Sequence, residues 1–310
     1  FVITKQVGNE NYWPAIITLS AVVLVCAALT MFAPEKPVKQ PVSKMNWEPV
    51  VRLAAMTGAF TLVILGSGAL VNGVNRLAAG LAEASALIAT ATIAVLGMVL
   101  AVVLGVWGSV RISLGKQNSQ VDKSFTWWVI NRLAFLVGTT NLSVFAVFYL
   151  QERFASLQGA SIEGMFGQLM LFVGLAIFIS SIPAGWLSDK IGKKPVCAIS
   201  GALALLGTIV IIVSPSSTML YIGGGLIGLA TGLFYSASWA LGTGLVPKQE
   251  AGRYLGIHNL AGAGAGAIGA YIGGPIGDGI GFTALMGIFG LLFLISTLAL
   301  FGIKETVNGD

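Results

Sequence analysis

Long apolar segments with almost no charge are the feature that most restricts what this chain can fold into. Nine of them follow one another, at about 13–33, 54–75, 85–108, 127–150, 165–187, 195–214, 218–246, 258–277 and 280–303. Each is close to the roughly 20 residues that an α-helix needs to cross a bilayer. Transmembrane β-strands are shorter and alternate in polarity along their length. The sequence therefore predicts an all-α polytopic membrane protein with about nine transmembrane helices.

Composition agrees with this fold class. Apolar residues make up 56% of the chain and charged residues 9%, whereas a soluble domain carries about 25% charged residues. The net charge is +5, which loop lysines and arginines explain without a nucleic-acid partner. The sequence contains no phosphate-binding loop, nucleophile–base pair or cluster of metal ligands. We therefore expect no enzyme, no cofactor, no metal site and no nucleic-acid binding.

The distribution of Lys and Arg predicts the orientation in the membrane. With the loop 188–194 placed in the cytoplasm, only Lys5, Arg76 and Arg153 of the 17 basic residues fall on the outer side. An excess of Lys and Arg is typical of cytoplasmic loops. We expect the N-terminus of this chain outside and its C-terminus in the cytoplasm, in a plasma membrane or a bacterial inner membrane. An odd number of spans that begins outside also predicts that further helices precede Phe1.

The loop after the fifth span carries the most specific motif. It reads Gly185-Trp186-Leu187-Ser188-Asp189-Lys190-Ile191-Gly192-Lys193-Lys194. Gly185 permits a close helix contact and Gly192 a tight turn, and Asp189 can pair with loop cations or with a helix N-terminus. The order of residues resembles the cytoplasmic motif of the major facilitator superfamily. The resemblance implies that Gly185, Asp189, Lys190, Gly192, Lys193 and Lys194 act as a latch between two helix bundles.

The resemblance also implies a domain organisation. In that family the motif lies between the second and third helices of each six-helix half, so 127–310 is expected to form a C-terminal six-helix bundle. Residues 1–53 are then the last helix of an otherwise missing N-terminal half, followed by its cytoplasmic loop. Residues 54–110 form a two-helix hairpin, as in fourteen-helix members of the family, and residues 111–126 form a cytoplasmic linker. In the alternative, the first three spans are helices four to six of a twelve-helix protein.

The function that the resemblance implies is secondary active or facilitative transport of a small solute by alternating access. The expected partners are the lipid bilayer, an unidentified small-molecule substrate, and the missing half or a partner subunit. The alternative is a non-transporting interaction or assembly subunit that keeps the same fold. Candidates for the substrate cavity are the polar residues inside the spans, namely Asn141, Gln168, Tyr235, Trp239, Asn259 and Tyr271. Candidates for a cytoplasmic gate are Arg132, Lys248 and Arg253.

Two further features leave alternatives open. Trp127 and Trp128 begin the fourth span, and adjacent tryptophans at such a position are typical of interfacial anchors. The span 258–277 is rich in glycine, several of them four residues apart. This spacing favours close packing between membrane helices, and it is equally compatible with a pliable helix that bends during transport.

Overall fold

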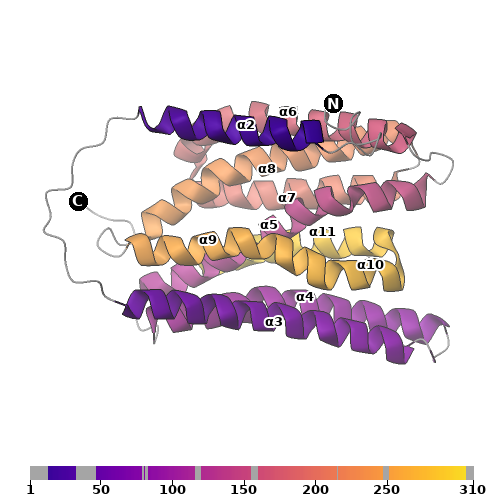
Figure 1. Cartoon of the computed structure of the whole chain (residues 1–310), viewed down its shortest axis with the longest axis horizontal. Helices are drawn as coiled ribbons and strands as arrows, with labels where there is room; N and C mark the ends of the chain where they lie inside the picture. The colour runs from indigo at the N-terminus through magenta and orange to yellow at the C-terminus, as the bar shows by residue number, and fades with distance from the viewer. Residues whose placement is uncertain are drawn as a thin grey trace, which may run out of the picture.

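The structure is a computed structural model that describes residues 13–32, 47–78, 80, 83–115, 120–154, 160–214, 216–246 and 251–304. Regular structure within these ranges is helical. The elements are α2 (Trp13–Thr30), α3 (Glu48–Ala78), α4 (Glu83–Leu114), α5 (Gln120–Arg153), α6 (Ala160–Ile191), α7 (Lys193–Val213), α8 (Ser217–Leu245), α9 (Ala251–Ile268), the π-helix η2 (Gly269–Gly273), α10 (Gly274–Ile280), α11 (Phe282–Ala299) and the short 3₁₀ helix η3 (Leu300–Gly302). Most helices run along the long axis of the molecule (Figure 1).

The predicted all-α polytopic membrane fold is confirmed. Seven helices of the described part are long and apolar enough to cross a membrane, and a shorter apolar helix covers Ile16–Thr30. The span expected at 258–277 differs, because a five-residue π-helix interrupts it and divides it into α9, η2 and α10. Several helices extend beyond their apolar segments; α5, for example, begins seven residues before the expected start at 127.

Helix α8 packs closely against α6 because of its glycines. Gly224, Gly228 and Gly232 recur every four residues and therefore lie on one face of the helix. A Cβ atom at Gly228 would lie 2.7 Å from the carbonyl oxygen of Val173 in α6, and one at Gly232 would overlap Ser180 of the same helix. Such a small-residue stripe allows two helix backbones to approach closely in a membrane.

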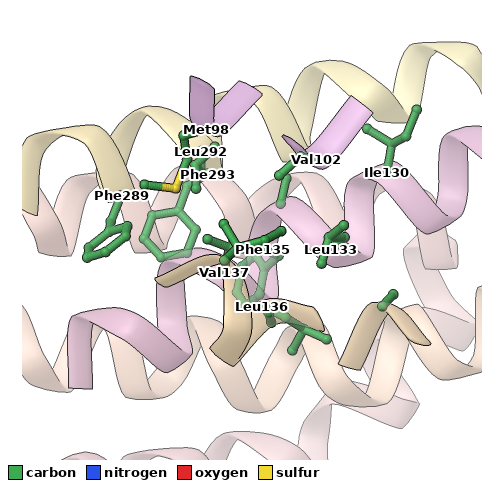
Figure 2. Packing of buried hydrophobic residues seen from close by; sticks show 14 of the residues in the cluster. Met98, Val102, Ile130, Leu133, Phe135, Leu136, Val137, Phe289, Leu292 and Phe293 are labelled. Atoms are coloured by element: carbon green, nitrogen blue, oxygen red, sulfur yellow. The ribbon is translucent and has the colours of Figure 1, made fainter. Parts of the chain in front are cut away.

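The interior of the bundle is built around stacked aromatic side chains. Phe135 of α5 stacks on Phe234 of α8, with ring centroids 3.7 Å apart, and tilts against Phe293 of α11 at 5.2 Å. Met98 of α4 belongs to the same cluster of buried residues, part of which is drawn in Figure 2. Residues from α4 thus share one apolar core with the six-helix segment that follows.

The hairpin α3–α4 packs against the interrupted helix α9–η2–α10 and against α5. Phe60 of α3 is 3% exposed and fills a space that only glycine leaves open, because a Cβ at Gly264 of α9 or Gly105 of α4 would overlap its ring. At the other end of the hairpin, the Asn75 side-chain amide donates a 2.7 Å hydrogen bond to the carbonyl oxygen of Pro275. The side chains of α2 from Ile16 to Thr30, by contrast, are all exposed.

Candidate functional site

The motif forms a tight turn between α6 and α7. Gly192 has φ +96° and ψ 151°, a backbone conformation that residues with a Cβ rarely adopt, and its N–H donates to the carbonyl oxygen of Ser188 at 3.0 Å. Lys194 donates to the carbonyl oxygen of Ile303 at 2.7 Å, which ties the turn to the chain after α11. Lys190 lies over the ring of Trp186, 4.9 Å from its centroid.

The carboxylate of Asp189 is exposed at this turn. In the described part of the chain, no ion pair to Asp189 is formed; the ion pair found there joins Arg52 and Glu48 at 2.6 Å. Beside Asp189 lies a hollow of about 300 Å³, which is lined by Ser188, Asp189, Gly192 and Lys193 from the turn and by Leu241, Gly244 and Leu245 from α8. The Ser188 hydroxyl is buried there without a hydrogen-bond partner. The turn therefore presents a carboxylate and a polar hollow to whatever packs on this end of the bundle.

The close helix contact expected at Gly185 is not found among the described residues. A Cβ atom at Gly185 would meet nothing within 4 Å, so this glycine makes no close helix contact here. Gly185 is half-buried, and the described neighbours leave room for a side chain at its position.

A second group of candidate side chains lies where α5 and α8 meet. Arg132 of α5 is 4% exposed. Its Nη1 donates to the Ser238 hydroxyl of α8 at 3.2 Å, and its guanidinium carbon lies 5.1 Å from the ring centroid of Trp239 and 5.8 Å from that of Tyr235. Both rings are about two-fifths exposed. The structure thus brings together one gate candidate and two cavity candidates from the sequence.

Trp128 and His258 extend this group toward α9. The Trp128 ring stacks on His258 with an interplanar angle of 9° and a centroid distance of 5.3 Å, and its Nε1 donates to the Ser238 carbonyl oxygen at 3.0 Å. Trp239 contacts the same histidine at 4.1 Å. Trp128 is 1% exposed, so the expectation of an interfacial anchor is wrong for it. Gly242 of α8 leaves the space that the indole occupies. We call Trp128, Arg132, Tyr235, Ser238, Trp239 and His258 the arginine–aromatic cluster.

Asn141 joins α5 to the start of the π-helix. Its side-chain amide donates to the Val137 carbonyl oxygen of its own helix at 2.8 Å and to the Ala265 carbonyl oxygen of α9 at 2.9 Å. Ala265 lies four residues before Gly269, where α-helical bonding gives way to π-helical bonding. A Cβ at Gly269 would overlap the Asn141 carboxamide. The asparagine therefore lies in a contact between helices, and it is 1% exposed.

The remaining candidates lie apart from the cluster. Gln168 is exposed on α6 and accepts a hydrogen bond from the Tyr221 hydroxyl at 3.2 Å. Asn259 and Tyr271 are exposed on α9 and η2. Lys248 and the side chain of Arg253 lie outside the described residues.

Sequence reasoning missed Ser238 as the hydrogen-bond partner of Arg132 and Trp128 as a member of the same cluster. The available signal was an arginine within an apolar segment, five residues after Trp127, which needs buried polar partners from another helix. Which helix supplies them depends on tertiary packing, and a single sequence does not contain that information.

Comparison with known proteins identifies related chains. The family model described as Major Facilitator Superfamily matches residues 127–309. The minor myo-inositol transporter IolF of Bacillus subtilis (strain 168) is 32% identical over 90 residues, which cover 29% of this chain and 20% of the relative. The inner membrane transport protein YajR of Escherichia coli (strain K12) is 31% identical over 152 residues, 49% of this chain and 32% of the relative.

The uncharacterized MFS-type transporter YuxJ of Bacillus subtilis (strain 168) is 28% identical over 181 residues, which cover 57% of this chain and 45% of the relative. The chain thus spans less than half the length of each of these relatives. No solved structure matches the chain significantly.

Proposed function

This chain belongs to the Major Facilitator Superfamily, whose model matches more than half of its residues, and we propose that it takes part in moving a small solute across a membrane by alternating access. The three relatives described above are transporters or transport proteins by name, one of them for myo-inositol. The side chains of the candidate site can bind a solute or pack against it. This is what the family requires, since its members carry solutes and do not transform them. The solute, its coupling to an ion and the direction of movement are separate from this proposal.

The observation that carries the proposal is the exposed carboxylate of Asp189 on a glycine-dependent turn, beside a polar hollow. A second six-helix bundle that packs on this end would bring a cation or a helix N-terminus to Asp189. Pairing would favour the conformer in which the two bundles are closed on the cytoplasmic side, and separation would favour the other. An interaction of this kind shifts the populations of two conformers because its free energy differs between them.

The interrupted helix α9–η2–α10 supports the same mechanism. π-helical turns are frequent at functional sites in helices and mark points where a helix bends. In this chain the π-helical turn begins four residues after Ala265, whose carbonyl group Asn141 binds, and it contains Gly269 and Gly273. We propose that this segment changes its bend as the two bundles exchange conformers.

We also propose the orientation and the domain division that the sequence predicts. The turn at 188–194 lies in the cytoplasm, 127–310 is the C-terminal bundle, and 54–110 is an accessory hairpin. The alternative twelve-helix division would make α3 and α4 part of the first half of the transporter. The packing of Phe60 between α4 and α9 is compatible with both divisions.

The test is solute flux into proteoliposomes that contain the full-length protein, at matched incorporation, for wild type, Asp189→Asn and Glu163→Gln. Sugars and organic anions are supplied as separate pools. Glu163 is an exposed carboxylate in the first turn of α6, the same helix that ends next to Asp189, and serves as the control. Exposed charge pairs contribute about 0–1 kcal/mol, so we expect Asp189→Asn to slow transport up to about fivefold, with Glu163→Gln unchanged.

Equal transport by Asp189→Asn and wild type would remove the latch from the proposal. A folded wild-type protein that moves none of the solutes, and that co-purifies with a stoichiometric membrane partner, would favour the alternative of an assembly subunit.

A further inference from the structure

Among the described residues, the charge on Arg132 is buried without a counter-charge. The residue is 4% exposed and lies ten residues after Asp122 along α5, which corresponds to about 15 Å of helix. Removing a charge from water is costly unless an opposite charge or several hydrogen bonds compensate it. No carboxylate of the described part forms an ion pair with Arg132. A charged residue left in this state inside a membrane bundle indicates a functional site.

The guanidinium also has donors to spare. A guanidinium carries five N–H groups in a planar fork. The contacts that hold it here are the hydrogen bond from Nη1 to Ser238 and the faces of Tyr235 and Trp239, while Nε is buried without a hydrogen-bond partner. A planar fork with free donors matches the oxygen atoms of a carboxylate or a phosphate.

A second orphan nitrogen lies in the same cluster. Buried side-chain polar atoms without a partner in the described part belong to Asn75, Asn131, Arg132, Ser188 and His258, and the two nitrogen atoms among them are Nε of Arg132 and Nδ1 of His258. Both side chains contact the ring of Trp239. Two buried nitrogen atoms that can donate hydrogen bonds therefore belong to side chains that contact one aromatic ring.

An apolar cavity adjoins this ring. It has a volume of about 210 Å³ and is lined by Phe125, Trp128, Trp239, Gly242, Thr243, Val246, Tyr254, Leu255 and His258. Pockets for drug-sized ligands usually measure about 300–1,000 Å³, so this cavity suits a smaller molecule. Its aromatic lining suits an apolar or aromatic body.

We infer that the arginine–aromatic cluster binds a small organic anion. Its apolar body would lie in the cavity that Trp239 and His258 line, and its carboxylate or phosphate group would reach Arg132, which contacts the same Trp239 ring and does not itself line the cavity. The inference rests on the proposed function in one respect, because it names the class of solute that is moved. Since Tyr235 and Trp239 are two-fifths exposed, rotation of these rings opens a path from the surface of α8 to the guanidinium.

Two other sources of an anionic group have to be distinguished from a free solute. A phospholipid headgroup offers the same phosphate chemistry, and a second helix bundle can offer a carboxylate side chain. The burial of the guanidinium beneath two rings and the small size of the cavity favour a free molecule over a lipid or a helix.

The test is equilibrium binding to the purified full-length protein in a neutral detergent. The probes are benzoate and phenyl phosphate, each compared with a neutral analogue, benzamide and benzyl alcohol respectively. The variants are Arg132→Gln, Arg132→Lys, Trp239→Leu and, as the control, Arg153→Gln at the other end of α5, where the arginine donates to the Ser214 carbonyl oxygen. Hydrogen bonds to charged groups contribute about 1.5–3 kcal/mol, so Arg132→Gln is expected to weaken anion binding about 10- to 100-fold.

Arg132→Lys keeps the charge and loses the fork, so an intermediate loss is expected. If Arg132→Gln does not fold, anion binding by Arg132→Lys tests the inference in its place. Trp239→Leu should weaken both anions several-fold, and Arg153→Gln should bind as wild type does. Tight binding of an anion by wild type, with losses confined to Arg132 and Trp239 variants, supports the inference.

Three results would overturn it. The first is that no anion binds wild type better than its neutral analogue. The second is that phosphatidylglycerol in nanodiscs abolishes benzoate binding in an Arg132-dependent way, which identifies a lipid site. The third is a crosslink or structure that pairs Arg132 with a carboxylate side chain of a second bundle. Flux measurements keep the two proposals apart: anion binding without transport contradicts the proposed function alone, and transport restricted to neutral solutes contradicts this inference alone.

Discussion

Replacement of Gly269 by alanine should destabilise the contact between α5 and the π-helix. A methyl group at this position would overlap the Asn141 carboxamide, and both residues are buried among neighbours that leave little room to shift. Overpacking of this kind costs about 1–3 kcal/mol in the free energy of unfolding. The matched control is Gly266→Ala on the same helix, where a Cβ would meet nothing within 4 Å. That variant should be neutral or slightly more stable, because alanine favours a helix over glycine.

Asn141→Ala separates the steric effect from the hydrogen bond. Loss of an interhelical hydrogen bond in a membrane costs about 0.6 kcal/mol on average and up to about 1.7. The double variant Gly269→Ala/Asn141→Ala should be about as stable as Asn141→Ala alone, because the atoms that the new methyl group overlaps are gone. The double variant should therefore be about 1–3 kcal/mol more stable than the sum of the two single-variant effects, and this difference is the coupling energy between the two sites.

The measurement is reversible unfolding of wild type and the four variants in mixed micelles with increasing SDS, followed by circular dichroism. Equal stability of Gly269→Ala and Gly266→Ala, or a coupling energy below about 0.5 kcal/mol, would refute the proposed contact. The same variants also test the mechanism, since Gly269→Ala should slow transport if the π-helix bends during the cycle.

Three further predictions concern other parts of the molecule. Phe60→Ala should destabilise the protein by about 3–5 kcal/mol, because the ring fills the space between Gly105 and Gly264. Limited proteolysis should then release the hairpin α3–α4 from the bundle. An unchanged digestion pattern would contradict this packing. Gly192→Ala should cost about 1–3 kcal/mol at the positive φ of the motif turn, visible as a lower unfolding temperature, and an unchanged temperature would argue against the turn geometry. A cysteine at Lys190 in intact cells should be protected from a membrane-impermeant maleimide while one at Ser216 reacts; the reverse pattern would invert the proposed orientation.

Several properties of this protein follow from the sequence because they depend on short-range patterns. The length and polarity of the apolar segments predict the all-α membrane fold, since a bilayer requires every backbone polar group to be bonded within the segment. The ten residues from Gly185 to Lys194 predict the family, which the family model confirms, and Gly192 has the positive φ that a tight turn requires.

Contacts between distant helices were beyond the reach of the sequence. The sequence suggests that Trp128 is a membrane anchor, but in the structure its indole packs against Gly242 and donates to the Ser238 carbonyl oxygen, both in α8. The sequence likewise suggests a gate role for Arg132, and only the structure shows that its guanidinium lies against aromatic rings of α8. From the sequence, Asn141 is a candidate for the substrate cavity, whereas in the structure α9 provides the carbonyl group that it binds and η2 the glycine against which it lies. The physical reason is that hydropathy fixes which segments enter the membrane, while the rotation and pairing of each helix depend on the fit of side chains on another helix. Only the tertiary structure decides that fit.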